Sequence, residues 1–109
     1  MPAIARADGT DKVLSITGSG YKCKFPTTVS TGKATQKKVT AGGVPVVVEG
    51  GIVAEHKLPG CIAIDKSPLK TYSSRVSVGG KKVARIADTY GEGEGLNTIT
   101  SGSSRVFAG

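Results

Sequence analysis

The chain has 109 residues, with 12 Val and 7 Ile against 4 Leu, 16 Gly, 5 Pro and no Trp. This length supports a single domain with a modest core, and frequent β-branched residues and glycines favour short strands and tight turns over helices. The formal net charge is +7, but the basic residues are scattered with few aromatic residues between them, which argues against a dedicated nucleic-acid groove.

The first expected element is a strand at residues 3–10. These residues match residues 82–89 at an offset of 79 (82 − 3), which makes them the returning half of a hairpin whose first half is missing here. The chain opens without the apolar run of a signal peptide, and no later stretch is apolar enough to span a bilayer. We therefore expect a protein that is made in the cytoplasm and stays there or leaves inside a larger assembly.

Two complete β-hairpins are predicted further along the chain. Residues 38–43 read Lys-Val-Thr-Ala-Gly-Gly, and residues 75–80 read Arg-Val-Ser-Val-Gly-Gly, an offset of 37 (75 − 38). The Gly-Gly pairs tolerate the positive φ that two-residue hairpin turns require, and each pair precedes a second strand. The motif returns at residues 104–109, where it can pair with residues 3–10. An all-β, closed and roughly threefold fold follows from this pattern.

The ordered set of segments resembles the PAAR-like family. The resemblance rests on the opening Met-Pro-Ala-Ile-Ala-Arg, the hairpins at 39–46 and 76–86 and the ending at 97–109, whereas residues 11–35 are the least typical. It identifies residues 1–109 as a single PAAR-like spike-tip domain. It implies a short pyramidal or conical fold of repeated β-hairpins in a pseudo-threefold arrangement.

The family resemblance also implies a function. Such a protein is a structural cap, not an enzyme, at the tip of the trimeric β-helical spike of a contractile tail in a phage, a tailocin or type VI secretion. One cap per trimer sharpens the spike for piercing the host cell envelope, so the expected location is the tail or baseplate of the particle. The expected spike contacts are the repeat strands around Val39, Val76 and Val106. The alternative is a basic small β-barrel that binds nucleic acid.

Catalysis finds little support in the residue pattern. The chain has one histidine, His56, without a recognisable triad around it. Glu92 and Glu94 stand between glycines and are expected in a solvated loop, because an acid–base pair needs rigid placement.

A metal site is the remaining candidate. The family resemblance implies an ion held by three histidines and one cysteine, whereas this chain offers Cys23, His56 and Cys61, one residue short of a closed four-ligand set. The fourth ligand is Asp65, Asp88, a water molecule or no recognisable group, and the ion is zinc or iron. Two alternatives stay open: a Cys23–Cys61 disulfide, or two buried thiols with an exposed His56 and no metal.

Overall fold

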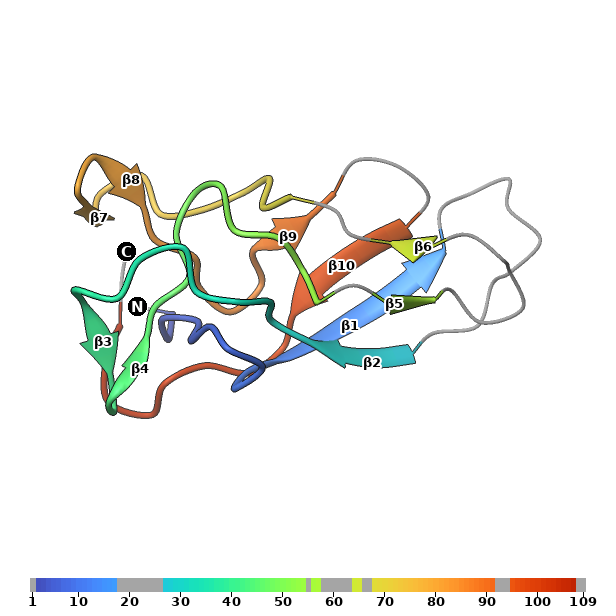
Figure 1. Ribbon diagram of the computed structural model, residues 1–109, viewed down its shortest axis with the longest axis horizontal. Helices are drawn as coiled ribbons and strands as arrows, with labels where there is room; N and C mark the ends of the chain where they lie inside the picture. The colour runs from blue at the N-terminus through green and yellow to red at the C-terminus, as the bar shows by residue number, and fades with distance from the viewer. Residues whose placement is uncertain are drawn as a thin grey trace.

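The structure is a computed structural model, which describes residues 2–17, 27–54, 56–57, 64–65, 68–91 and 95–107. All regular structure among these residues is antiparallel β, and no helix occurs in them (Figure 1). The predicted all-β fold is confirmed. The molecule is elongated, with principal dimensions of 39 × 23 × 21 Å.

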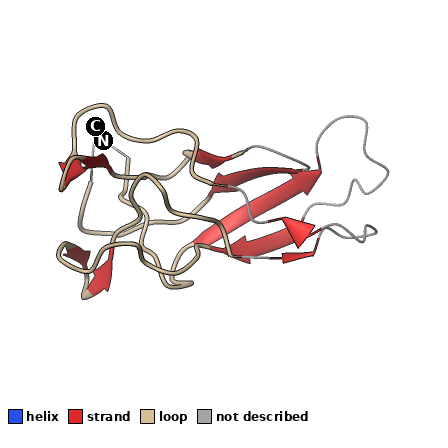
Figure 2. Cartoon of the chain, turned by 45° about the horizontal axis from the view of Figure 1, so that its top comes forward, coloured by secondary structure: helices blue, strands red, loops and turns tan. Residues whose placement is uncertain are grey.

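The largest sheet has four antiparallel strands in the spatial order β2-β1-β10-β9, and it forms the long strands of Figure 2. Along β1 the side chains alternate: Val13 and Ser15 are buried, whereas Leu14 is exposed. This period of two is the mark of a strand with one face on the core. The bounds are β1 (Lys12–Thr17), β2 (Thr27–Ser30), β9 (Thr89–Tyr90) and β10 (Gly95–Ile99).

Three short hairpins make up the rest of the regular structure in the described residues. Two of them turn on Gly-Gly pairs, Gly42–Gly43 with φ of 61° and 81° and Gly79–Gly80 with φ of 56° and 83°. Two successive positive φ angles match the twist of a hairpin and are natural for glycine. Both predicted hairpins are thereby confirmed. The strands are β3 (Thr40–Ala41) with β4 (Val44–Pro45), β7 (Ser77–Val78) with β8 (Lys81–Lys82), and β5 (His56–Lys57) with β6 (Ile64–Asp65).

Residues near the two ends of the described chain pair with each other as the two strands of each Gly-turned hairpin do. Thr40 faces Pro45 across the first hairpin, Ser77 faces Lys82 across the second, and Phe107 forms an antiparallel bridge with Ala3. Residues from opposite ends of the sequence thus pair as the two sides of a hairpin do. This pairing confirms the predicted closure of the chain on itself.

Residues 4–6, 46–48 and 83–85, which we call the central segments, follow these three strand pairs and contact one another in the interior. The amide of Ala5 donates to the carbonyl of Ala84 (3.0 Å), Ala84 donates to Val47 (2.8 Å), and Val47 donates back to Ala5 (3.0 Å). We call this closed cycle the central ring. Bridges repeat the cycle, since Ile4 pairs with Arg85, Val46 with Arg6, and Val83 with Val48.

The central segments divide the core into two clusters. Their middle residues, Ala5, Val47 and Ala84, are buried with side chains of the four-stranded sheet such as Val13 and Tyr90. Their first residues belong to a second cluster beneath the hairpins, made of Ile4, Ala41, Val46, Val48 and Val83. Neighbouring residues of an extended chain point to opposite faces, so each central segment supplies both clusters. The sheet and the hairpins are thereby held on either side of the central ring.

Candidate functional site

The two Gly-turned hairpins and the Ala3–Phe107 pair lie at one end of the molecule, which we call the hairpin end (Figures 1 and 2). Each strand pair is tied to its own central segment by the same backbone bond. Ile4 donates to the carbonyl of Val106 (2.9 Å), Val46 to that of Val39 (3.2 Å), and Val83 to that of Val76 (3.1 Å). The three valines proposed as spike contacts therefore occupy matching places.

The exposure of these valines differs. Val39 is 44% exposed, whereas Val76 and Val106 are half-buried and pack against the cluster beneath the hairpins. Phe107, one residue after Val106, is 47% exposed. An apolar contact with a partner is thus available at Val39 and Phe107, and the other two valines contribute mainly to the core.

A side chain three residues before each valine fixes the approach to the strand. Ser73 Oγ accepts from the amides of Arg75 and Val76, and Ser103 Oγ accepts from those of Arg105 and Val106, at 3.0–3.1 Å. Gln36 has this place in the hairpin of β3 and β4, where its Oε1 accepts from Val39 (3.0 Å) and its Nε2 donates to the carbonyl of Val46 (3.1 Å). In all three copies a side chain at this place accepts from the amide of the valine, and in two of them it also accepts from the amide of the residue before it.

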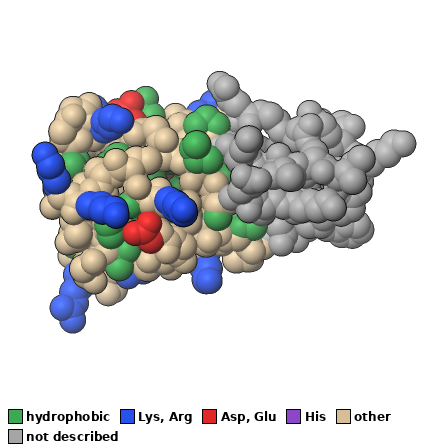
Figure 3. Space-filling view, viewed as in Figure 1, with side chains coloured by type: hydrophobic (Ala, Val, Ile, Leu, Met, Phe, Trp, Pro, Cys, Tyr) green, Lys and Arg blue, Asp and Glu red, His purple; other side chains and the backbone are tan. Residues whose placement is uncertain are grey.

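The hairpin end is strongly basic. Residues 36–46, 73–83 and 103–107 contain six Lys and Arg and no Asp or Glu. In Figure 3, Lys and Arg side chains stand out from the end of the molecule where the hairpins lie. An anionic partner is favoured at this surface by simple electrostatic attraction.

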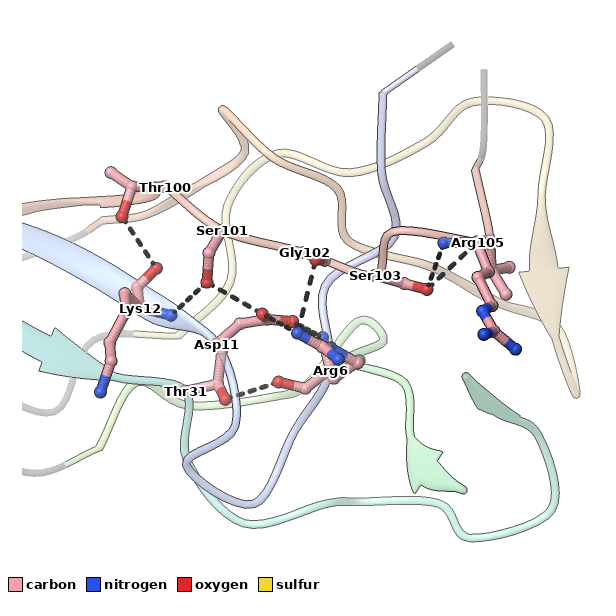
Figure 4. A network of polar contacts seen from close by, with 10 residues as sticks. Arg6, Asp11, Lys12, Thr31, Thr100, Ser101, Gly102, Ser103 and Arg105 are labelled. Carbon is pink, nitrogen blue, oxygen red and sulfur yellow. Dashed lines mark hydrogen bonds and ion pairs between the residues drawn. The ribbon is translucent and has the colours of Figure 1, made fainter. Parts of the chain in front are cut away.

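Two matching polar networks, which the sequence did not reveal, support the hairpin end (Figure 4 shows the first). Asp11 is fully buried and accepts from the Arg6 amide (2.6 Å), Nε (3.0 Å) and Nη2 (2.8 Å), and from Ser101 Oγ (2.9 Å). The second Nη2 contact of Arg6 is the carbonyl of Gly102 (3.4 Å). This arrangement ties the N-terminal central segment to residues 101–102, which lead from β10 toward Phe107.

Arg85 and Asp88 repeat the arrangement. Asp88 accepts from the Arg85 amide (2.7 Å), Nε (3.0 Å) and Nη2 (3.2 Å), and from Thr71 Oγ1 (3.0 Å), while Arg85 Nη2 also contacts the carbonyl of Tyr72 (3.3 Å). In the remaining central segment the residue at this place is Val48, which is buried in the core. The match of Arg6 to Arg85 was visible in the sequence repeat, but their acidic partners follow at different spacings, five and three residues on.

The contact between Arg6 and Asp11 shifts the pKa of both side chains. Burial by itself raises the pKa of Asp11, but the hydrogen bonds from the Arg6 guanidinium and amide and from Ser101 outweigh it, and the pKa lies below its usual value. The same ion pair raises the pKa of Arg6. Asp11 is therefore a structural carboxylate that stays ionised.

An open groove with a volume of about 810 Å³ lies beside loops 31–35 and 50–54. Its charged residues include Asp8 and Lys33, and Asp8 Oδ1 accepts from the amide of Ala34 (2.8 Å). Thr31 Oγ1, also at the groove, donates to the carbonyl of Arg6 (2.6 Å). These polar groups are occupied in holding the loop in place.

The metal candidates are only partly described. Cys23 and Cys61, like Glu92 and Glu94, lie outside the described residues. His56 in β5 is the backbone partner of Asp65 in β6, so two of the candidate ligands occupy opposed positions of one hairpin. Asp88 does not fit a ligand role, because Arg85 and Thr71 engage its carboxylate.

Among residues with described side chains, no group of three or more metal-binding residues gathers. The metal site stays a prediction.

In the described residues no helix is long and apolar enough to cross a membrane. No protein-family model matches the chain, and no curated protein is similar enough to it to count as a relative.

Proposed function

We propose that this protein is a structural cap that seats its hairpin end on a threefold protein partner, the blunt tip of a trimeric β-helical spike. The observation that carries the proposal is the central ring, in which Ala5, Val47 and Ala84 exchange backbone hydrogen bonds cyclically. Segments bonded in such a cycle are arranged most simply about a pseudo-threefold axis. A single chain with three similar faces is matched to three identical subunits.

The strand edges at the hairpin end give the partner something to contact. The strands β3 and β7 are two residues long and pair on one side only among the described residues, with β4 and β8. A cap placed over the end of a spike would cover exposed strand edges of the spike, which otherwise invite edge-to-edge association. In this role the protein works by rigidity in the tail or baseplate of a contractile particle and carries out no reaction.

The proposal predicts a stoichiometry of one cap per spike trimer. A trimeric β-helical spike protein from the same genome is mixed with the purified chain, and the complex is weighed by native mass spectrometry. One copy of the chain per trimer is the expected result. Binding of three copies, or a chain that ignores the trimer, would contradict the cap function.

A matched pair of neutral substitutions tests which end docks. Val39 at the hairpin end is 44% exposed, and Leu14 on the sheet is 39% exposed. Val39→Gln is expected to weaken binding about tenfold, the equivalent of about 1.4 kcal/mol of lost apolar burial, whereas Leu14→Gln leaves the affinity unchanged. If Leu14→Gln is the damaging variant, the sheet end faces the partner.

A further inference from the structure

One exposed cation precedes each of the three matching valines at the hairpin end. The residues are Lys38, Arg75 and Arg105, each immediately before Val39, Val76 and Val106 and each exposed. We call them the cation triad. Their shared place along the repeat is fixed by the backbone, because the following valine carbonyl accepts the amide of a central segment in all three copies.

The cation triad is not used within the described part of the chain. The ion pairs found there are Arg6–Asp11 and Arg85–Asp88, and none of the hydrogen bonds found there involves a side chain of the triad. Figure 4 shows the contrast at Arg105, whose backbone amide is bonded to Ser103 while its guanidinium points away from the network. By comparison, the guanidinium of Arg6 is committed to Asp11.

Among the described residues, no acidic side chain forms an ion pair with the cation triad. The segments that carry the triad contain no Asp or Glu, and the carboxylate of Glu49 accepts from the backbone amide of Lys82 (2.8 Å) and not from a triad side chain. Three like charges at matching places repel one another and favour a surface that brings three anions. Pairing all three cations requires three anionic groups, one at each site.

Resting on the cap function above, we propose that the cation triad pairs with three equivalent carboxylates, one from each subunit of the trimeric partner. Each ion pair sits at the rim of the interface, beside the apolar contact of Val39 and Phe107. Such rim pairs speed encounter and fix the rotational register more than they raise affinity. The partner is thus a trimer with an Asp or Glu of each subunit on its blunt end.

The test uses the same spike trimer and compares two triple variants of equal charge change. One carries Lys38→Glu, Arg75→Glu and Arg105→Glu, and the other carries Lys12→Glu, Lys33→Glu and Lys70→Glu at exposed sites outside the three hairpin segments. The first is expected to lose affinity about 100-fold and to lose most of the salt dependence of binding, whereas the control changes it only a few-fold. Circular dichroism and thermal unfolding establish that both variants fold.

The single reversals sharpen the test. Each of the three is expected to weaken binding by about fivefold, and by the same factor within about twofold, because the three sites are equivalent. Replacing the acidic residues at the blunt end of the trimer by lysine is expected to restore binding of the triad variant.

Three results would overturn the proposal. If the triad variant and the control weaken binding equally, only long-range attraction is involved. If one single reversal accounts for the whole loss, the partner does not bring three equivalent carboxylates. In both cases the wild-type chain still binds one per trimer and the cap function stands. If the wild-type chain does not bind the trimer, the cap function and the triad pairing fail together.

Discussion

Arg6 and Arg85 show how a single residue type is used twice for the same task. Each donates from its amide, Nε and Nη2 to one buried carboxylate, and each guanidinium also contacts a backbone carbonyl of a neighbouring segment. A carboxylate held by several charge-assisted bonds is stabilising only while its partners remain, because the buried charge alone is costly. The third central segment has Val48 where the other two have arginine, so it needs no buried carboxylate as a partner.

Asp11 gives the first prediction. Asp11→Asn is expected to lower the free energy of unfolding by about 2 kcal/mol at pH 7, since the Arg6 guanidinium loses its ionic partner. The pKa of Asp11 in the folded chain lies below that in the unfolded chain, so its ionisation stabilises the fold above about pH 4 and this contribution is lost as the pH falls through the folded pKa.

Urea unfolding at a series of pH values from 7 to 3 checks this prediction. The gap between wild type and Asp11→Asn is expected to narrow at the acid end of the series. A gap that stays constant over this range would show that the ionisation of Asp11 does not contribute.

Ala87 gives the second prediction. Its φ is 75°, in the region that favours glycine, and the residue at the same place of another copy is Gly50, with φ of 87°. Ala87→Gly is therefore expected to raise the free energy of unfolding by about 1 kcal/mol, and Gly50→Ala to lower it by about the same amount. A Cβ at Gly50 would meet only Lys81 Nζ at 3.8 Å, so the change reports on backbone conformation and not on a clash. Thermal unfolding of both variants measures the two shifts, which should be opposite in sign.

At the scale of elements, the hairpins of β3–β4 and β7–β8 were predictable and the large sheet was not. A Gly-Gly pair between short segments that contain β-branched residues is a local signal, and it marked both turns correctly. The sheet depends on distant residues, since Val13 in β1 pairs with Ile99 in β10, 86 residues away (99 − 13). No turn motif joins these strands, and residues 11–35 match no copy of the repeat. Their pairing is set by burial of Val13 and Ile99 in the finished core, which a local pattern does not reveal.

The Ala3–Phe107 pair predicts that the chain tolerates a circular permutation. Four residues separate the paired positions in each complete hairpin, 41–44 and 78–81, and four also lie between Phe107 and Ala3 when residue 109 is joined to residue 1. We expect a permutant that starts at Gly80 and ends at Gly79 to fold, provided Met1 becomes Gly to match the positive φ of Gly43 and Gly80. Its free energy of unfolding should fall within about 2 kcal/mol of the original.

The matched control opens the chain between Val47 and Val48 with the same joined ends. This cut divides a central segment and turns the buried Val47 carbonyl of the central ring into a charged carboxylate, so the control is expected to remain unfolded by circular dichroism. Equal folding of the two permutants would show that the three strand pairs are not interchangeable units.

At the scale of the whole molecule, the buried ion pairs and the exposed cations lie in different regions. The buried charges, Asp11 and Asp88, are paired within the chain, whereas the exposed cations of the hairpin end have no acidic neighbours in their own segments. Composition gave the net charge of +7 but not its location, because the basic residues are scattered in sequence and six of them come together in the hairpin segments. Of the candidate metal ligands, His56 and Asp65 lie opposite each other in one strand pair, whereas Cys23 and Cys61 lie outside the described residues.

The central ring also has a consequence for how the protein is made. Its three members are residues 5, 47 and 84, and two of its three bonds, those that join Ala84 to Ala5 and to Val47, cannot form until residue 84 has been made. The first hairpin can therefore form early, but the interior it packs against is completed only after residue 84 has joined, and the bond from Ile4 to Val106 needs residues that are made later still. Folding of this chain is therefore expected to end in one late, concerted closure of the central ring.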